Sequence, residues 1–583
     1  MQAGGAGAGP RGRPGAARRG RARRAALPPL LLLLAGGALG YGVGFAKLFE
    51  DAPEEVADAR LAVDGSLPVW LEGTLVRNGP GQFHFGKRKA TLAFDGFAKL
   101  HRFRVSGGEV VYSSRFLRSD SFNRTVETRG DLAPIQTFGA LDPCLSIFGK
   151  AQGLFEMNDN MLVNVVRVGT SYLALSDAVG ALQFDLDSLA TLGAPPGIPQ
   201  GGGFPSVDGD GPFAPRPRAG YSSAPATPRV AGAVGASGAP PSDSLTSVRI
   251  LGCAHPVPDP IMPGHSLQLL FRLGLLTESS VELFRISPDM QTTTVWRKNE
   301  LGSLPYIHSF SVTEHYAVLF FYPLVWNRRR FLELKHPNES LEWKGESQRT
   351  VVHVLDLRTG ATIAELETDP IFSFHHIDAY EEAGGQEIVV RLVGYPEGHV
   401  VREFWDMPLE TLRNPASRDI PRPGCIPEPH EFRIDLGRRV VEHMLLADHS
   451  APDNQGLSAS RLELPRVNDA WTGRQHCFTY GIVLNSLVGR DELWAAEALS
   501  KFDLCGQGRS QVWRRENQYP SEPVFVPAPG AQAEDDGVLL SAVLDGDSGG
   551  SYLLVLNATN LETLATAEVK GPHIPFGFHG DFF

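Results

Sequence analysis

The 583-residue chain is poor in cysteine, and the few cysteines it has are scattered. No two of them form a Cys-x-x-Cys pair, and their number is odd. This pattern predicts neither a zinc knuckle nor a disulfide framework. The five are Cys144, Cys253, Cys425, Cys477 and Cys505.

Basic charge is scarce outside the N-terminus. Residues 1–24 carry seven arginines and no acidic residue, so the rest of the chain has 47 Lys and Arg against 66 Asp and Glu, a formal charge of -19. Proteins that bind nucleic acid carry basic surfaces. The composition therefore argues against a nucleic-acid partner, while 42% hydrophobic and 21% charged residues are typical of a globular protein.

Long amphipathic helical patterns are also scarce between residues 70 and 583. Instead, short apolar segments recur in pairs around turns that begin with Asp, Asn or Ser-Pro, as in residues 182–189 and 354–362. Phe103–Val105 and Val110–Tyr112 flank Ser106-Gly-Gly, a sequence typical of a tight hairpin. Irregularly spaced hairpins over about 500 residues favour an all-β fold, a β-propeller of four-stranded blades. Two stacked β-sandwiches are the alternative.

The N-terminal segment, residues 1–50, has the pattern of a targeting signal or signal anchor. An Arg-rich stretch precedes the apolar run Ala25–Phe45, as in a cleaved signal peptide or a retained signal anchor. The run is long enough to cross a bilayer. We therefore expect a membrane-associated protein targeted to a plastid or to the endomembrane system, with a folded body over residues 51–583. Within that body, the Gly- and Pro-rich residues 193–242 predict a low-complexity loop insertion.

The chain has seventeen histidines, and none of them forms a His-Glu-x-x-His motif. A metal site would therefore need ligands from distant segments, which a propeller permits because its inner strands converge on one axis. Four histidines stand among apolar or aromatic residues, where an imidazole needs a hydrogen-bond partner or a metal. Each of them alone is equally consistent with a hydrogen-bonded core residue. The four are His255, His308, His375 and His579.

Three of these histidines lie within a series of seven motifs. The chain carries, in order, Leu71–Gly81, Phe94–His101, Tyr306–Glu314, Phe374–Glu381, Tyr519–Pro527, Glu534–Gly537 and Pro575–Gly580. In these motifs the chain resembles the carotenoid cleavage oxygenase family, which includes the retinal pigment epithelial membrane proteins. The resemblance runs from about residue 60 to the last residue.

The resemblance implies a seven-bladed β-propeller with iron on its axis and a cap of loops and short helices over a substrate tunnel. It implies that Fe2+ is held by His255, His308, His375 and His579, and that the neighbouring His376 is not a ligand. Metal-bound imidazoles need their second ring nitrogen oriented, usually by a carboxylate. The positions that match the family's three carboxylates are Asp177, Glu463 and Glu522.

Asp177 departs from the family pattern, which usually has Glu there. Its side chain is one methylene shorter, so we expect it to reach its histidine through a shifted backbone or a water molecule. The alternative is that Asp177 is a surface turn residue outside the site.

The implied reaction is oxidative cleavage of one C=C bond of a carotenoid or apocarotenoid by O2, which gives aldehyde or ketone products. Two other functions stay open: retinoid isomerohydrolysis, and carotenoid binding without turnover. Four aromatic residues near the motifs are candidates for the tunnel lining, or else for packing between blades: Phe310, Phe374, Phe525 and Phe578.

A polyene substrate dissolves in membranes, so we expect the protein to contact a membrane surface. Leu267–Leu276 and Phe320–Phe331 combine apolar residues with nearby basic ones, including Arg328–Arg330, as interfacial segments do. The alternative for these segments is a buried strand followed by a solvated basic loop.

Overall fold

The computed structural model describes ten stretches of the chain. They are residues 42–86, 88–128, 159–199, 247–274, 276–333, 340–401, 409–413, 426–446, 457–484 and 497–583.

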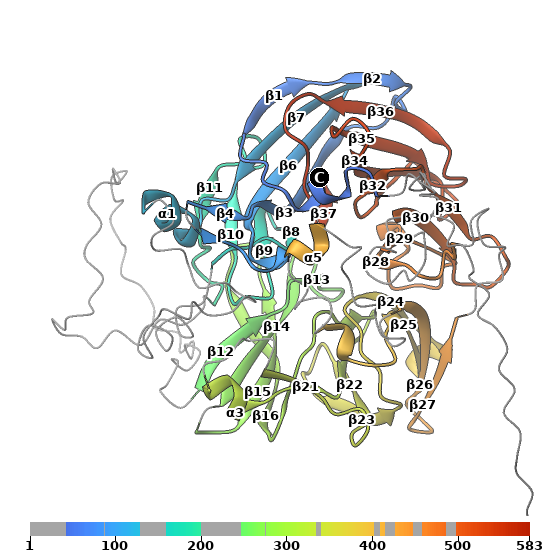
Figure 1. The fold of residues 1–583 in the computed structure, drawn as a ribbon. Coiled ribbons are helices and arrows are strands. Elements are labelled where there is room, and N and C mark those ends of the chain that lie inside the picture. The colour runs from blue at the N-terminus through green and yellow to red at the C-terminus, as the bar shows by residue number, and fades with distance from the viewer. Residues whose placement is uncertain are drawn as a thin grey trace, which may run out of the picture. The chain divides into compact units, whose positions relative to one another are not determined.

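These residues build a seven-bladed β-propeller, which confirms the predicted fold class (Figure 1). Each blade is a sheet of four to six antiparallel strands. Five innermost strands lie side by side around the axis: β37 beside β8, and β24 beside β18 and β28. The predicted cap over a tunnel stays a prediction.

The first three blades contain the following strands, in order from one edge of each sheet to the other. Blade one holds β1 (Val56–Arg60), β7 (Glu109–Phe116), β6 (Phe97–Ser106), β3 (Gly73–Gln82) and β37 (Gly580–Phe582). Blade two holds β11 (Thr191–Gly193), β10 (Leu182–Phe184), β9 (Ser171–Leu175) and β8 (Asn164–Val168). Blade three holds β16 (Thr292–Leu301), β15 (Ser279–Ile286) and β14 (Ser266–Gly274), with β12 (Ser247–Gly252) and β13 (Val257–Pro258) both paired to β14.

The remaining four blades follow in chain order. Blade four holds β23 (Thr362–Thr368), β22 (Thr350–Asp356), β19 (Tyr316–Phe321) and β18 (Ser311–Val312). Blade five holds β27 (Val440–Leu445), β26 (Glu428–Asp435), β25 (Glu387–Gly394) and β24 (His376–Glu382). Blade six holds β31 (Gln511–Trp513), β30 (Glu497–Asp503), β29 (Phe478–Leu484) and β28 (Glu463–Arg466). Blade seven holds β2 (Ala62–Gly65), β36 (Thr563–Val569), β35 (Ser551–Asn557) and β34 (Gly537–Asp545), with β32 (Gln518–Pro520) and β33 (Val524–Pro527) both paired to β34.

Smaller elements connect the blades. Two small sheets comprise β17 (Leu304–Pro305), β20 (Leu324–Trp326) and β21 (Leu341–Trp343), and β4 (His84–Phe85) with β5 (Arg88–Lys89). The described helices are short: α1 (Asp120–Glu127), α3 (Arg328–Leu332), α5 (Leu409–Arg413), and the 3-10 turns η1 (Phe45–Phe49), η2 (Ala93–Asp95), η4 (Ala383–Gly385) and η7 (Asp469–Trp471). Within the described stretches, no helix combines the length and apolar character needed to span a membrane.

The two ends of the described chain close the ring. C-terminal β37 pairs with β3 in blade one, and N-terminal β2 pairs with β36 in blade seven, so the blue and red strands interleave in Figure 1. Both pairings join strands about 500 residues apart in sequence. At the first closure a side chain on Gly79 would place its Cβ 2.8 Å from the backbone of Gly577, so the Gly-Pro-Gly segment of β3 permits this approach.

The predicted hairpins form for the reasons that their turn residues suggest. Gly107 and Gly108, between β6 and β7, both have positive φ, as a tight two-residue hairpin turn requires. Between β22 and β23, the Asp356 carboxylate accepts hydrogen bonds from the backbone N–H groups of Arg358 and Thr359. Side-chain capping of this kind stabilises the turn and sets the strand register.

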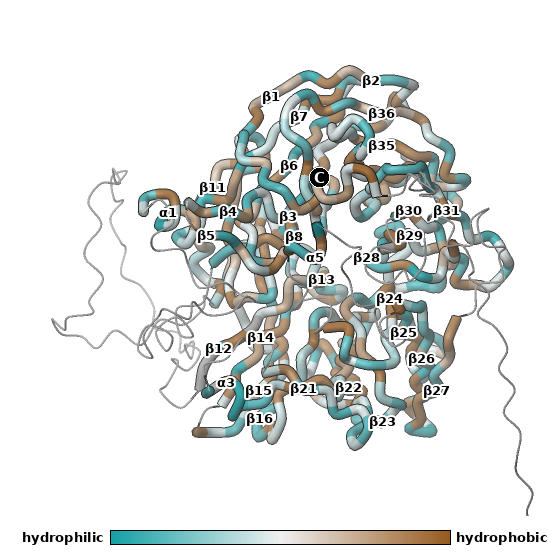
Figure 2. Tube along the Cα trace, in the orientation of Figure 1, coloured by the Kyte–Doolittle hydropathy of each residue, from teal (hydrophilic) through white to brown (hydrophobic). Residues whose placement is uncertain are grey.

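Burial differs between the inner and outer strands of a blade. In blade four, five of the six residues of β19 are buried, whereas outer β23 alternates buried and exposed residues from Ala364 onward. A strand covered on both faces is continuously apolar, and a strand at the solvent edge alternates. Figure 2 accordingly shows brown and teal mixed along the blades without one long hydrophobic run.

Part of the predicted N-terminal segment belongs to the folded body. Phe45 and Phe49 are buried, and the Tyr519 hydroxyl donates to the carbonyl of Val43. The apolar run before residue 42 lies outside the described residues. Most of the predicted insertion 193–242 does too, since only its first residues, from the end of β11 to Pro199, are described.

The proposed membrane-docking segments require a correction. Leu267–Leu273 belong to β14, whose residues are almost all buried, and Trp326 and Phe331 are each only 6% exposed. The apolar side chains of β14, Trp326 and Phe331 are therefore part of the core, whereas Leu276, the last residue of the first predicted segment, is 79% exposed. The structure favours the alternative, a buried strand followed by a basic segment at α3.

The prediction of no disulfide framework also needs a qualification, because Cys477 and Cys505 form a disulfide. The bond joins Cys477, the residue before β29, to Cys505, the second residue after β30. It lies next to Phe478 and Asp503, which pair across the two strands. It therefore fastens the open end of a hairpin. The 28-residue separation gave no motif by which the sequence could reveal it. Among the described cysteines, only Cys253 is free, and it is buried.

We expect the double variant Cys477→Ser/Cys505→Ser to be less stable to urea by about 3 kcal/mol, because the crosslink restricts a loop of this length in the unfolded chain. Urea unfolding followed by tryptophan fluorescence measures the difference. Reductant should lower the urea midpoint of the wild type to that of the variant and leave the midpoint of the variant unchanged. Coincident midpoints for wild type and variant without reductant would contradict the expected stabilisation.

Candidate metal centre

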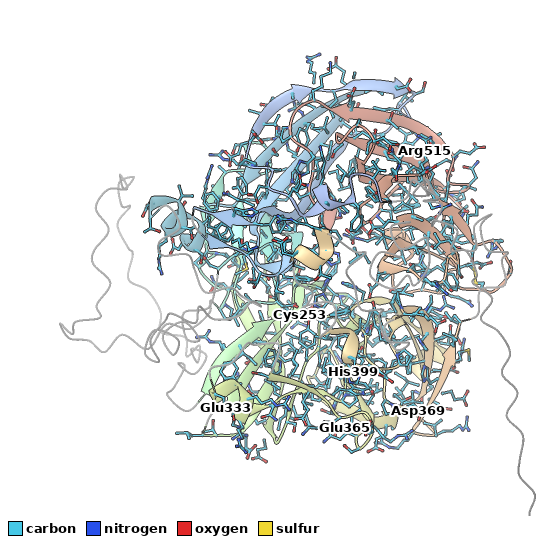
Figure 3. The ribbon with its side chains drawn as sticks, viewed as in Figure 1. Cys253, Glu333, Glu365, Asp369, His399 and Arg515 are labelled. Carbon is cyan, nitrogen blue, oxygen red and sulfur yellow. A yellow bond between two sulfur atoms is a disulfide. The ribbon has the colours of Figure 1, made fainter. Side chains whose placement is uncertain are left out.

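The four predicted histidines meet at the inner strands of the propeller. His375 directly precedes β24 and His579 directly precedes β37, while His255 lies between β12 and β13, and His308 between β17 and β18. Cys253, two residues before His255, lies near the centre of the ring in Figure 3, whereas Glu365 and Asp369 lie at its rim. Blades one, three, four and five thus each bring one imidazole to the axis.

The rings are close enough to share one ion. One ring nitrogen from each histidine lies within 4.8 Å of the other three, and the Nε2 atoms of His255 and His308 are 3.1 Å apart. Nitrogens bound to one metal at about 2.1 Å stand about 3 Å or more apart. Burial lowers the pKa of His579 to about 4, and burial with the neighbouring imidazoles lowers that of His255 well below its usual value. These two rings are neutral at pH 7, as metal ligands must be.

Three carboxylates bind the other side of three of these rings, and they are the three that the resemblance implies. His308 Nδ1 lies 2.9 Å from Asp177, His375 Nδ1 lies 2.6 Å from Glu463, and His579 Nδ1 lies 2.8 Å from Glu522. Each contact uses Nδ1, so Nε2 of each ring is directed away from the carboxylate. Such partners fix the tautomer and the orientation of a metal-binding imidazole. In the described part of the chain, the His255 ring has no carboxylate partner.

Asp177 binds His308 directly, so of the two expected alternatives, a shifted backbone or a bridging water, the water is not needed. The residue is 3% exposed, which also excludes the surface-turn alternative. It follows β9, and its backbone carbonyl accepts the N–H of Gly252 at 2.9 Å. The shorter side chain of Asp177 reaches His308 because the Asp177 backbone itself lies close to the segment that carries His255.

Glu463 owes its direction to an irregularity in β28. The register of β28 against β29 shifts between Glu463 and Arg466, and Leu464 has a positive φ of 51°. A bulge redirects side chains that would otherwise alternate strictly. The result is that Glu463 reaches His375 while Arg466 reaches Glu522.

Glu522 lies between two arginines. Arg77 donates to it at 2.9 Å and Arg466 at 3.0 Å, and the N–H of Gly580 donates at 3.0 Å. Burial alone would raise the pKa of Glu522, but Arg466, His579 and Arg77 hold it well below its usual value. The carboxylate is therefore fully ionised.

The residues fit a divalent cation on two further grounds. Asp177 and Glu463 are buried, yet no Lys or Arg in the described stretches pairs with either, so their charge lacks a compensating cation. His375 Nε2 is buried and has no hydrogen-bond partner. A metal ion bound by the four imidazoles would satisfy both the charge and this nitrogen.

The comparisons with known proteins identify the family of the chain. The family model "Retinal pigment epithelial membrane protein" matches residues 49–583, nearly the whole chain. The chain belongs to this family.

Its named relatives in this family cover almost the full length of the chain. The mitochondrial carotenoid-cleaving dioxygenase of Pongo abelii is 28% identical over 91% of this chain and 93% of its own. The beta,beta-carotene 15,15'-dioxygenase of Homo sapiens is 27% identical over 88% of this chain and 90% of its own. Among solved structures, the cobalt-substituted apocarotenoid oxygenase (ACO) of Synechocystis superposes with a TM-score of 0.69, at 21% identity over 93% of this chain and 98% of its own.

His376 is not placed to bind a metal, unlike its neighbour His375, as the family resemblance implies. Its Nδ1 lies 2.6 Å from the Ser311 hydroxyl and its Nε2 lies 3.0 Å from the Tyr322 hydroxyl. Both ring nitrogens are therefore used within the protein, and none is left for a metal.

Sequence reasoning missed the residues that hold the three carboxylates. These are Arg77 and Arg466 at Glu522, Tyr395 at Glu463, and Tyr306 at Asp177. Arg77 and Tyr306 lie inside the family motifs, but the motifs do not indicate which carboxylate either residue contacts. Burial of an arginine or a tyrosine next to a carboxylate leaves no local signal in the sequence.

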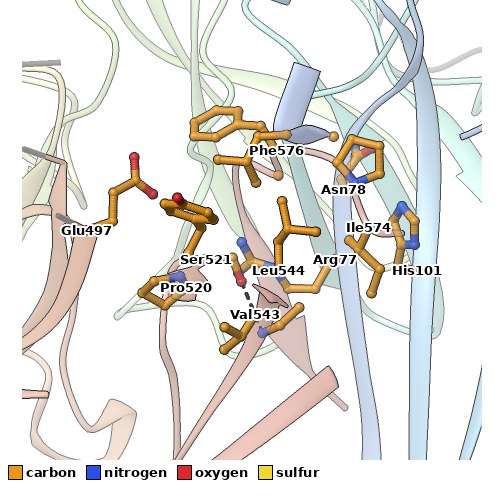
Figure 4. Close-up of a pocket in the computed structure, with 16 residues that line it drawn as sticks. Arg77, Asn78, His101, Glu497, Pro520, Ser521, Val543, Leu544, Ile574 and Phe576 are labelled. Atoms are coloured by element: carbon orange, nitrogen blue, oxygen red, sulfur yellow. Dashed lines mark hydrogen bonds between the residues drawn. The ribbon is translucent and has the colours of Figure 1, made fainter. Parts of the chain in front are cut away.

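The four aromatic candidates for the tunnel have different surroundings, and one of them, Phe310, is buried in the largest core cluster. Phe374 packs edge-on against the His308 ring, with centroids 5.5 Å apart, and so lies at the centre itself. Phe525 stacks on Tyr480 and Phe578 stacks on Phe94, which is packing between and within blades. None of the four predicted phenylalanines lines the small pocket in Figure 4, which lies around Arg77, His101 and Tyr519. The four histidines do not line that pocket either, and the tunnel stays a prediction.

We expect His375→Ala to lose most of the bound iron, because it removes one imidazole, whereas the adjacent His376→Ala should retain it. Iron per protein chain, measured by inductively coupled plasma mass spectrometry after reconstitution with Fe2+, distinguishes the two. Equal iron content in both variants would contradict the assignment of ligands at this pair.

Proposed function

We propose that the protein is a non-haem iron(II) dioxygenase that cleaves one C=C bond of a carotenoid or apocarotenoid with O2. The observation that carries this proposal is the cluster of four converging imidazoles with three buried carboxylates, within a family whose named relatives are carotenoid-cleaving enzymes. The products are two carbonyl fragments, each of which takes one atom of the dioxygen.

His255, His308, His375 and His579 are the proposed ligands of Fe2+, and Asp177, Glu463 and Glu522 orient three of them. Four neutral imidazoles suit a divalent iron and leave coordination positions open. Iron bound there supplies the reaction with dioxygen. The chain's own carboxylates fix the tautomers of three of the imidazoles, and the surrounding residues bury the four rings.

Phe374 supports an apolar substrate. Its ring packs against His308, so a polyene beside the metal would contact hydrocarbon. The cleavage balances with O2 alone, so the reaction needs no catalytic acid or base beside the metal. The rigid surroundings decide which double bond lies beside the metal.

In this proposal, the protein also contacts a membrane surface, and the N-terminal segment targets it to its compartment. The Cys477–Cys505 disulfide supports an oxidising compartment, since such bonds are rare in reducing ones. This favours the endomembrane system over a plastid. The Arg-rich stretch before an apolar run agrees with entry through a signal or anchor.

Product analysis tests the reaction. The protein, reconstituted with Fe2+ and incubated with β-carotene, a xanthophyll or a long apocarotenal under 18O2, should give aldehydes or ketones labelled with 18O in both fragments, with rapid extraction to limit exchange with water. His308→Ala should abolish them, because it removes one imidazole and the contact to Asp177, whereas His376→Ala should retain most of the activity.

Other outcomes would point to the alternatives. Isomerised or hydrolysed retinoids without incorporated oxygen would indicate isomerohydrolysis. Bound carotenoid and bound iron with no product would indicate a binding protein. Either result would contradict cleavage by dioxygen.

Localisation is tested on protein from the cells that naturally make it. After rapid acid quenching and alkylation, we expect a disulfide-linked peptide that contains Cys477 and Cys505, and we expect the protein to sediment with membranes. Buried Cys253 should be alkylated only after denaturation, which serves as the control. Alkylated Cys477 and Cys505 would contradict an oxidising compartment.

A further inference from the structure

The hydroxyl of Tyr306 completes a triangle with Asp177 and His308. It donates to Asp177 Oδ2 at 2.9 Å, and it lies 3.0 Å from His308 Nδ1, which is itself 2.9 Å from the same Oδ2. Tyr306 is fully buried and follows β17, where its N–H donates to the carbonyl of Leu324. Its ring stacks on buried Phe372, with centroids 5.9 Å apart, so the core helps to hold it.

The hydrogen bonds at Asp177 differ from those at Glu463, the carboxylate that Tyr395 contacts. Tyr395 donates to Oε1 of Glu463, while His375 binds the other oxygen, Oε2. At Asp177, both donors share one oxygen. The remaining oxygen, Oδ1, faces the N–H of Ala254 at 3.4 Å, a long contact.

The shared oxygen matters because a carboxylate rotates readily about its last torsion, which has a broad energy profile. The Asp177 backbone is held by Gly252, but apart from His308 and Tyr306 the described residues give its carboxylate only the long Ala254 contact to set its plane. A second short hydrogen bond to Oδ2 restricts that rotation. The orientation of the carboxylate in turn sets the direction of the His308 ring.

We propose that Tyr306 is a positioning residue of the metal centre, which holds the Asp177 carboxylate so that a side chain one methylene shorter than the family's usual glutamate still orients His308. The proposal rests on the proposed function in one respect, the metal bound by the four histidines. It concerns the orientation of one imidazole and requires no substrate.

The same geometry explains why the two positions depend on each other. One more methylene at position 177 would advance the carboxylate by about 1.5 Å. Oδ2 already stands 2.9 Å from both Tyr306 and His308, so a glutamate needs the space that the hydroxyl occupies. Removal of the hydroxyl makes that space available, and the longer side chain then reaches His308 without help.

Cobalt(II) binding without substrate tests the proposal, by chelator competition and by the visible absorption bands of the bound ion. We expect Tyr306→Phe to weaken cobalt affinity about ten-fold and to shift the bands, because His308 is no longer held in one orientation. Tyr322→Phe is the matched control: it removes another buried tyrosine hydroxyl, one that bonds the non-ligand His376 and Ser373 and contacts none of the three carboxylates in the described residues. We expect its affinity and bands to equal those of the wild type.

A double-mutant cycle separates positioning from simple loss of stability. In an Asp177→Glu background, Tyr306→Phe should raise cobalt affinity instead of lowering it, because it frees the space that the longer side chain needs, so the two changes are coupled. Thermal unfolding of the metal-free variants identifies any general loss of structure.

Two results would overturn the proposal: equal affinities and spectra for Tyr306→Phe and Tyr322→Phe, or the same fall in affinity in both backgrounds. A wild-type protein that binds neither cobalt nor iron would instead contradict the metal centre itself. Metal binding without polyene cleavage would contradict the proposed reaction and leave the role of Tyr306 supported or refuted by the binding data alone.

Discussion

The antiparallel pairing of β37 with β3 is the constraint on which the rest of the structure depends. It joins the last residues of the chain to blade one, and it places His579 one residue before the closing strand. Closure of long-range β contacts costs loop entropy, which many buried contacts must offset. The histidine cluster exists only when this pairing is made, since the other three imidazoles come from blades three, four and five.

The three carboxylates differ in what holds them, and their environments divide the charge of the site unequally. Glu522 is neutralised by Arg77 and Arg466, whereas Asp177 and Glu463 are held by neutral tyrosine hydroxyls and backbone N–H groups. Buried charge without a counter-charge is costly. The surplus negative charge beside His308 and His375 is thus available to a bound cation. The phenols supply hydrogen bonds without adding positive charge that would repel it.

The sequence was sufficient to predict the all-β propeller, the four histidines and the three carboxylates that the structure brings together. Those predictions rested on hairpin turns with local signals, such as Gly107-Gly108, and on family motifs that run continuously along the chain. The long-range features were not predictable in this way. The contacts of Tyr306 and Arg466 arise from segments of different blades that meet only in the folded ring, and the Cys477–Cys505 bond joins two strands of one blade without a local motif. Trp326 shows the same limit, because an aromatic residue beside arginines has one pattern whether it faces lipid or, as in this protein, the core.

Glu522 links ring closure to the metal centre through a single side chain. It binds His579 and the N–H of Gly580 at the closing strand, Arg77 of β3 in blade one, and Arg466 of β28 in blade six, while its own segment belongs to blade seven. A carboxylate with this many donors has one favourable position, since each displaced contact would leave a buried charge or N–H group unsatisfied. The orientation of His579 is consequently determined by the junction of three blades. In the opposite direction, Arg466 and Glu463 share the bulged strand β28, so the same strand also sets His375. Two of the four imidazoles are therefore positioned by the hydrogen bonds that hold the last blades together, and the geometry of the centre follows from closure of the ring.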